Sequence, residues 1–489
     1  MSPIALPIAE LKPALTGLAK VINRHSALPV LNTIRIERTP DNWVALTATD
    51  LDTFVVVRLE QPVPGDPGAL LVPYDELLKT LKGRGKDEVL FVEPGDNHTA
   101  VIRYAIGDQF AETRVESLPV EEYPPLPNIS GAPIPVDAAL RSAIQQALQC
   151  ASTDETRLIL NGAYLDVSKP KAHYVVGTDG RHLFSSNSFV LPLKESLLIP
   201  SHRFLGWKEF SADGEWQLRV GEKNKDNAPP FQLSSRRWQF ISRQIEGNYP
   251  NWRQVVPDGR GTQTTIEVDP EAVEAIQQTI TRMPDHDFVN HGLGLEVIGH
   301  QVRLLGKSSP DDAWTRVTLD GVKIHGKEVT TFLNRELLAK ALRFGLTRID
   351  VIDAMSPVRF SEGGRQMIVM PVRASPAPTK PTPPPASGPV APQANPTPKA
   401  EQPETTMPEQ NGHTNGATRS TPTAAPAEKP ALETALAQIE IVRGDFRNAI
   451  AGLNKLGDAL KQAQREQKAG DKEVQSVRQT LRSLQSVRI

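Results

Sequence analysis

The stretch "TATDLD", Thr47 to Asp52, is nearly repeated by "VGTDGR", Val176 to Arg181, at an offset of 129 residues. Other segments align at the same spacing. "LN" at Leu31 falls on "LN" at Leu160, and a further shift brings Asn32 onto Asn290. Self-similarity at a fixed period decides architecture before any local motif does. Because this period is domain-sized, the pattern predicts three consecutive copies of one domain.

Composition limits the protein class. The chain has 489 residues, 39% hydrophobic and 23% charged, with a net charge of −2, so the whole-chain balance gives no sign of nucleic-acid binding. Cys150 is the single cysteine, which excludes an intrachain disulfide and favours a reducing, cytoplasmic setting. The N-terminus lacks a signal-peptide pattern, and no apolar run is long enough for a membrane helix.

Each copy opens with an amphipathic helix, as in "LKPALTGLAKVI", where Leu11, Leu15, Leu18 and Ile22 share one face. Strand-like runs, a second helix and more strands follow. We therefore predict an α+β fold in which each copy is an antiparallel sheet with two helices on one face. The predicted domains are residues 1–129, 130–258 and 259–373.

Composition changes after Arg373. Residues 374–430 contain 15 of the 43 prolines and no aromatic residue, which predicts a disordered Pro-rich linker. Residues 431–489 regain an apolar spacing of three or four, which predicts a helical hairpin or coiled coil that engages a partner. Self-association and capture of a replication or repair protein are both open, with weak DNA contact as a lesser option.

Residues 1–373 resemble the bacterial β sliding clamp, the β subunit of DNA polymerase III. The resemblance rests on "ALPVLNTIRIE", "LTATDLD", "LPVEEYPPLP", "LILNGAYLDV", "VVGTDGRHLF", "IEGNYPNWRQVVP" and "IVMPVR", in that order. In that family the chain ends shortly after the segment matching "MPVR". The resemblance therefore says nothing about residues 374–489.

The resemblance implies a non-catalytic processivity factor. Two three-domain subunits would form a head-to-tail ring with sheets outside and helices inside, encircling duplex DNA without sequence preference. Implied partners are a second copy, the polymerase III catalytic subunit, the clamp loader and other proteins with a clamp-binding motif. No cofactor, metal or membrane is expected. An alternative is a clamp-derived scaffold or accessory clamp that does not stably encircle DNA.

A sliding ring needs weak phosphate contacts that carry no sequence information. The candidates are basic residues on or beside the predicted helices: Lys12, Lys20, Arg24, Lys79, Lys82, Arg84, Lys86, Arg141, Arg203, Lys208, Arg335, Lys340 and Arg343. For any one of them a solvated helix face is an equal alternative. Glu271 and Glu274 make the first helix of the third copy less basic.

The family docks partner peptides between its second and third domains. By residue-level match the cleft here comprises Leu160, Thr178, Gly180, Arg181, His182, Leu183, Pro250, Val255, Asn334, Met355, Val358, Met370, Pro371 and Val372. Leu160 and Leu183 also suit a core. Arg181 precedes His182, the reverse of the common family order, and Gln254 stands where a basic residue is frequent.

The segment that would close the ring, Pro284 to Asp287, is polar, whereas apolar side chains close the ring in well-known family members. Ion-pair closure, a weak ring and help from the tail helices are all open. Catalytic motifs are absent from the sequence: "GRGK" at 83–86 lacks phosphate-loop spacing, and His286 and His291 lack metal-ligand partners at suitable spacing.

Overall fold

The computed structural model describes residues 1–373 apart from 25, 188 and 223–227. The predicted linker and helical segment, 374–430 and 431–489, lie outside the described residues. The first part of the chain forms β1 (Ile4–Pro7), α1 (Ile8–Leu18), η1 (Pro29–Asn32), β2 (Thr33–Arg38), β3 (Val44–Thr49), β4 (Thr53–Arg58), β5 (Gly68–Pro73), α2 (Tyr74–Thr80), β6 (Val89–Pro94), β7 (Thr99–Ile106), β8 (Gln109–Glu116) and η2 (Val120–Glu122).

The middle part repeats this order of elements. It forms β9 (Ile134–Val136), α3 (Ala138–Cys150), η3 (Glu155–Leu160), β10 (Gly162–Asp166), β11 (Tyr174–Thr178), β12 (His182–Ser186), β13 (Leu197–Pro200), α4 (Lys208–Ala212), β14 (Trp216–Val220), β15 (Pro230–Ser234), β16 (Trp238–Arg243) and η4 (Trp252–Val255).

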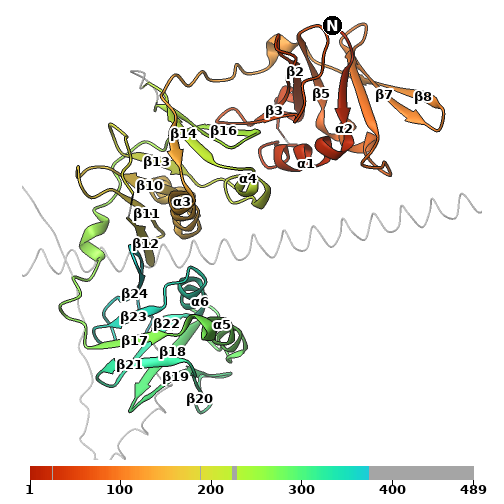
Figure 1. Cartoon of the computed structure of the whole chain (residues 1–489). Coiled ribbons are helices and arrows are strands. Elements are labelled where there is room, and N and C mark those ends of the chain that lie inside the picture. Colours follow the sequence, from red (N-terminus) through yellow and green to blue (C-terminus); the bar gives the residue numbers. More distant parts are fainter. Residues whose placement is uncertain (25, 188, 223–227, 374–489) are drawn as a thin grey trace, which may run out of the picture. The chain divides into compact units, whose positions relative to one another are not determined.

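The last described part follows the same plan with one added strand, β21. It forms β17 (Thr264–Val268), η5 (Pro270–Ala272), α5 (Val273–Arg282), β18 (Gly292–Ile298), β19 (Gln301–Gly306), β20 (Thr315–Thr318), β21 (Val322–Gly326), β22 (Val329–Asn334), α6 (Arg335–Arg343), β23 (Arg348–Val351), β24 (Val358–Glu362) and β25 (Arg365–Val369). Within the described residues, the α-helices occur in three pairs along the sequence, α1 with α2, α3 with α4 and α5 with α6 (Figure 1).

The described strands form four antiparallel sheets, and the two largest cross the predicted repeat boundaries. One has the order β5-β2-β3-β4-β16-β15-β14-β9 and the other β13-β10-β11-β12-β25-β24-β23-β17-β21. The other two have the orders β1-β6-β7-β8 and β20-β19-β18-β22. The prediction of one sheet per repeat was therefore wrong, because the strands of each repeat are divided between two sheets. A strand at the edge of one repeat pairs with the next and satisfies its backbone groups there.

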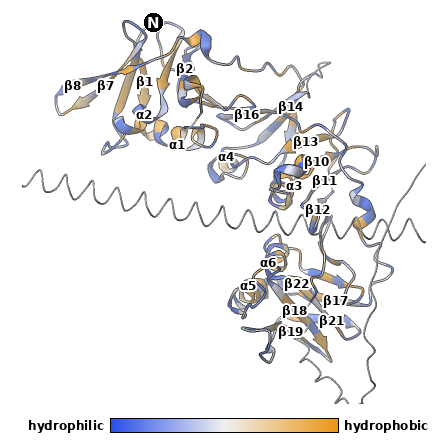
Figure 2. Ribbon diagram, turned by 180° about the vertical axis from the view of Figure 1, so that it is seen from behind, coloured by the Kyte–Doolittle hydropathy of each residue, from blue (hydrophilic) through white to orange (hydrophobic). Residues whose placement is uncertain are grey.

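The core follows the predicted apolar faces. In α1, Leu11, Leu15, Leu18 and the following Ile22 are at most 6% exposed, as the helical spacing predicted. Hydrophobic residues concentrate in the strands (Figure 2). The second helix of the middle copy, which the sequence "SHRFLGWKEF" predicts over 201–210, is shorter than predicted, because α4 begins only at Lys208. Before it, the amides of Leu205 and Trp207 donate to carbonyls three residues back, which makes successive turns.

The turn between β3 and β4 completes "TATDLD" and is held by side-chain hydrogen bonds. The Thr49 hydroxyl donates to the Thr53 carbonyl at 2.8 Å and accepts from the Leu51 amide at 3.0 Å. The Thr53 amide donates to the Asp50 carboxylate at 2.8 Å. Leu51 lies in the left-handed region of the backbone map, with a φ of 87°. Side-chain oxygens thus replace the backbone partners that a tight turn cannot supply.

The turn between β11 and β12 has the same bonds 129 residues later. The Thr178 hydroxyl donates to the His182 carbonyl at 2.6 Å and accepts from the Gly180 amide at 3.1 Å. The His182 amide donates to Asp179 at 2.9 Å, and Gly180 has a φ of 88°. The predicted offset is confirmed at these turns, atom for atom. Each turn precedes the strand that pairs with the next repeat, β4 or β12.

Candidate functional site

Part of the predicted basic set is committed to the fold. These side chains donate to backbone carbonyls: Lys12 to Arg84, Arg84 to Thr80, Arg141 to Ser211 and Gly214, Arg203 to Ala19 and Lys20, Arg335 to Met283 and Pro284, and Lys340 to Gln149. A cation near carbonyls at a helix end is stabilised by the helix dipole. A contact between these side chains and DNA would have to coexist with their hydrogen bonds to backbone carbonyls.

The other predicted cations are more available. Lys82, Lys86, Lys208 and Arg343 are exposed. The Arg24 side chain is 50% exposed and lies 3.6 Å from Asp75. The remaining two have close partners: Lys79 pairs with Glu76 at 2.5 Å, and Lys20 lies 5.5 Å from the Trp207 ring centroid. Glu271 in η5 and Glu274 in α5 are exposed, so they place negative charge at the surface of the third copy.

Three of the predicted DNA contacts line a cavity of about 740 Å³. It lies between the segment after α1, the β3–β4 turn and the segment before α4. Its lining residues are Ala19, Lys20, Val21, Ile22, Asn23, Arg24, Asp50, Ser201, His202 and Arg203. Lys20, Arg24 and Arg203 make it cationic, so it suits a phosphate group.

Two titratable groups in the lining of this cavity are half-buried, His202 and Asp50. Burial, with the Arg203 and Lys20 charges, lowers the pKa of His202 to about 4, so its imidazole is neutral at neutral pH. Burial raises the pKa of Asp50 above its ordinary value, while the Thr53 amide opposes that rise. The lining therefore presents three cations, Lys20, Arg24 and Arg203, and one carboxylate, Asp50.

The structure brings together the two strands at the centre of the predicted peptide cleft. β12 pairs with β25 from His182↔Val369 to Ser186↔Arg365, and the Met370 amide donates to the Arg181 carbonyl at 3.0 Å. Three of the predicted cleft residues are apolar and exposed: Met355 at 55%, Val255 at 49% and Met370 at 44%. They are available as anchor contacts for a peptide.

Other predicted cleft residues are core. Those at most 8% exposed are Leu160, Thr178, His182, Leu183 and Val358. Gly180, Arg181 and Pro250 are exposed, while Asn334, Pro371 and Val372 are half-buried. Leu158, in η3, is 61% exposed and was not among the predicted cleft residues. It stands two residues before the predicted Leu160, so its position in the sequence could have marked it as a candidate.

An aromatic and ionic cluster fixes the segment that carries Pro250 and Val255. Asp166 accepts from Trp252 Nε1 at 2.9 Å and from Arg253 at 2.6 Å. Burial acts to raise the pKa of Asp166, but hydrogen bonds from Ser168 and Trp252 lower it below its ordinary value. The carboxylate is therefore ionised at neutral pH and holds this cleft wall against β10.

Comparisons with known proteins agree with this architecture. Residues 8–127 match the family described as DNA polymerase III beta subunit, N-terminal domain. The beta sliding clamp of Pseudomonas putida is 22% identical over 380 residues, covering 75% of this chain and 98% of the relative. That of Synechocystis is 24% identical over 395 residues, covering 75% and 97%.

Solved structures show the same fold. The DNA polymerase III subunit beta from Pseudomonas aeruginosa matches with a TM-score of 0.64 at 20% identity, covering 76% of this chain and all of that one. The beta subunit from Streptococcus pyogenes gives the same TM-score and identity. Most of the chain is similar to the bacterial β sliding clamps in sequence, and its fold is theirs. The resemblance seen in the sequence is confirmed, and the region after Arg373 is an extension relative to these clamps.

The edge strands of the described sheets include β8 and β20, each with one hydrogen-bonded neighbour among the described residues. Phe110 on β8 is 68% exposed. Phe288 and Val289, directly after the polar segment 284–287, are 80% and 81% exposed. The interpretation of this edge as polar was therefore incomplete, because the compared stretch "MPDHDF" ends in Phe288 and Val289 follows it.

A polar chain crosses the junction at β12 and α6. His182 Nδ1 lies 2.8 Å from Asp179 Oδ1, and its Nε2 lies 3.4 Å from Lys340 Nζ. Lys340 also donates to the Gln149 carbonyl at 3.0 Å. Residues from two clamp repeats thus share one network, so Lys340 is a junction residue as well as a predicted DNA contact.

Among the described residues, no cluster of three or more His, Cys, Asp or Glu side chains is placed to hold a metal ion. Cys150 is buried, and burial raises the pKa of its thiol to about 12, which disfavours the nucleophilic thiolate. Within residues 1–373 as described, no helix has the length and apolarity needed to cross a membrane.

Proposed function

We propose that the chain is a DNA sliding clamp: a non-catalytic, cytoplasmic processivity factor that encircles duplex DNA as a head-to-tail homodimer. The observation that carries the proposal is the pairing of β4 with β16 and of β12 with β25. By position in their sheets, β20 corresponds to β4 and β12, and β8 corresponds to β16 and β25. A second copy would supply the missing partner of each edge.

The internal repeat also gives a register for that ring junction. Val56 opposes Gln239 at the first junction and Ser185 opposes Gln366 at the second. Following the strand registers across each sheet, Arg316 takes the place of Val56 and Glu112 takes the place of Gln239. Opposite charges would therefore face each other across the ring junction, which supports ion-pair closure.

The exposed cations and the cationic cavity support contact with DNA phosphates from inside such a ring. The exposed Met355, Met370 and Val255 support docking of a clamp-binding peptide, from the polymerase III catalytic subunit, the clamp loader or a repair protein. For residues 431–489 we keep the proposal of an interaction segment, whose partner their sequence leaves open.

The alternative is a clamp-derived scaffold that does not stably encircle DNA. The observations behind it are the hydrogen bonds of Arg141, Arg335 and Lys340 to internal carbonyls and the exposed Glu271 and Glu274, but the comparisons do not favour it. The deciding experiment loads the full-length protein onto nicked circular DNA with its clamp loader and then linearises the DNA. A ring is retained on the circle and lost on cutting, whereas a scaffold behaves alike on both forms.

A further inference from the structure

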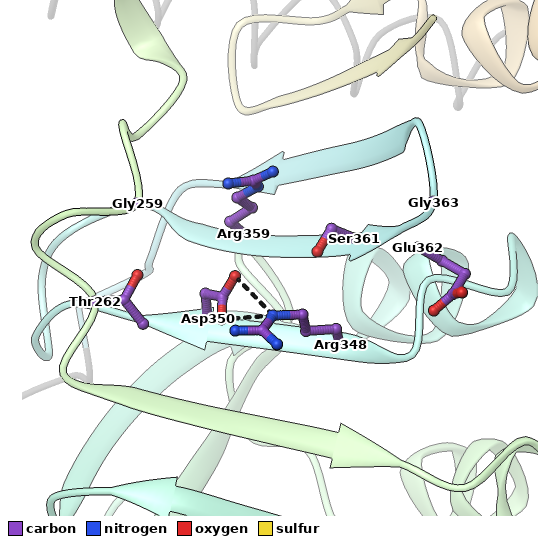
Figure 3. A pocket seen from close by; sticks show the side chains of 8 residues that line it. All are labelled: Gly259, Thr262, Arg348, Asp350, Arg359, Ser361, Glu362 and Gly363. Atoms are coloured by element: carbon purple, nitrogen blue, oxygen red, sulfur yellow. Dashed lines mark hydrogen bonds and ion pairs between the residues drawn. The ribbon is translucent and has the colours of Figure 1, made fainter. Parts of the chain in front are cut away.

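A second cavity, of about 370 Å³, lies on one face of the nine-stranded sheet, and its lining includes none of the predicted cleft residues or DNA contacts. Its lining residues are Gly259, Thr262, Arg348, Asp350, Arg359, Ser361, Glu362 and Gly363 (Figure 3). They come from the segment before β17 and from β23, β24 and the turn after β24. The lining contains two arginines and two carboxylates, so its formal charge is zero. Which of these groups already have partners therefore decides what the cavity can bind.

Every charged side chain in this lining except Arg359 has an ion pair or a hydrogen bond within the described residues. Asp350 accepts from Thr265 Oγ1 at 2.8 Å and from Arg348 Nε at 3.1 Å. Arg348 also lies 3.4 Å from Glu267, and Glu362 accepts from Thr347 Oγ1 at 3.0 Å. Figure 3 shows the Arg348–Asp350 pair on β23 and Glu362 at the far side of the cavity from Arg359.

Arg359 is the unmatched cation. It opposes Asp350 in the β23–β24 register, yet that carboxylate is taken by Thr265 and Arg348. No ion pair joins Arg359 to another described residue, and its Nε is buried without an acceptor. A buried N–H without a partner costs about 1–3 kcal/mol, and native structures seldom leave one unsatisfied.

The guanidinium is also well placed to receive a ligand. A Cβ at Gly259 would lie 3.7 Å from Arg359 Nη1, so the guanidinium faces this segment without filling the space. A Cβ at Gly363 would meet no atom within 4 Å, so that rim is open. A water molecule occupies roughly 30 Å³ of liquid, so the cavity has room for a partly hydrated oxyanion.

We propose that this cavity is an oxyanion site, in which Arg359 binds a phosphate or carboxylate group through its planar N–H fork. Such bidentate, charge-assisted bonds are short and directional, and they would give the orphan N–H an acceptor or place a bound water beside it. Ser361 and Thr262 line the same cavity and offer hydroxyl donors to the remaining oxygens. The site is independent of ring formation.

The test is titration of the full-length protein with inorganic phosphate and, separately, with acetate at constant ionic strength, followed by calorimetry and backbone NMR shifts. We expect saturable binding of at least one anion, weakened tenfold or more by Arg359→Gln and less by Arg359→Lys. Lys323→Gln, at a surface cation outside the cavity, should leave binding unchanged. Thermal unfolding of each variant checks that it is folded.

Each outcome has a defined meaning. Binding of phosphate alone assigns a phosphoryl ligand, and binding of acetate alone assigns a carboxylate ligand. Absence of saturable binding, or binding that folded Arg359→Gln retains in full, overturns the proposal and leaves the cavity to solvent.

Discussion

Leu51 and Gly180 occupy the same position in two equivalent turns and share one backbone conformation, with φ angles of 87° and 88°. Glycine adopts this region freely, whereas a Cβ makes it costly. Leu51 is 49% exposed, so its side chain gains little burial in return. The first junction turn is therefore strained where the second is not.

Replacing Leu51 with glycine should stabilise the protein. Relief of left-handed strain is worth about 1–2 kcal/mol and exceeds the added freedom of glycine in the unfolded chain, about 0.4–1 kcal/mol. We expect a gain of roughly 0.5–1 kcal/mol, measured by urea unfolding. Leu51→Ala is the matched control, since it keeps a Cβ and should show no gain. A less stable Leu51→Gly protein would contradict the strain argument.

The ring junction predicts a charge swap. Glu112→Arg and Arg316→Glu should each weaken self-association, because each places like charges opposite one another, while the double variant should recover. Exposed pairs contribute about 0.2–1 kcal/mol, but reversal adds repulsion at both junctions of a dimer. Sedimentation velocity across a concentration series measures the effect. If the loss of self-association in the double variant equals the sum of the losses in the two single variants, the predicted register is wrong.

If the basic residues contact DNA phosphates, replacing them should reduce retention on DNA to the same extent for every DNA sequence. Reversing Lys20, Arg24 and Lys82 to Glu should shorten the lifetime of the loaded protein on circular DNA equally for unrelated sequences, because phosphates carry no base information. Lys323→Glu is the control, on a strand of the sheet rather than a helix. Unequal loss among sequences would point to base readout instead of sliding.

The repeat, the helix faces and the resemblance could be read from the sequence because they are periodic. Leu11, Leu15 and Leu18 lie on one face at helical spacing and are buried. The division of strands between sheets could not be read, because β4 and β16 are 180 residues apart in the chain and nothing local in "TFVVVRLE" shows that its partner is "WQFISR".

The candidate sites show the same limit. Residue type marked Lys12, Arg141 and Arg335 as possible DNA contacts, but their hydrogen bonds to carbonyls arise only from tertiary folding. Leu183 matched a cleft motif, yet it is 3% exposed, whereas Leu158 is 61% exposed and matched none. Exposure depends on which segments cover a residue, and a linear pattern does not contain that information.

The exposed fractions of the predicted cleft side chains decide which variants can test peptide binding. Met355→Ala and Met370→Ala together should weaken binding of a clamp-binding peptide by about 2 kcal/mol or more if these side chains are anchors. Their exposure means that folding should be little affected. Leu183→Ala is unsuitable as a binding test, since emptying a buried leucine site costs about 2–5 kcal/mol of stability. Fluorescence anisotropy of a labelled peptide gives the affinity, and unchanged affinity would place the site elsewhere.

The Asp179 carboxylate predicts an acid-dependent contribution at the second junction turn. Burial acts to raise its pKa, but bonds from the His182 side chain and from the amides of His182 and Arg181 lower it to about 2 from 3.8. Because the folded pKa lies below the unfolded one, the ionised form stabilises the fold above pH 3.8. That stabilisation disappears as the pH falls through about 2.

Asp179→Asn should therefore be less stable than the parent at pH 6, by up to roughly 2 kcal/mol, and the difference should shrink steadily between pH 4 and pH 2. Asparagine keeps the shape and can still accept from the His182 amide, so the variant removes mainly the charge. Urea unfolding at a series of pH values measures the difference, with exposed Asp108→Asn as the matched control. A gap between parent and Asp179→Asn that stays constant down to pH 2 would show that the charge does not stabilise this turn.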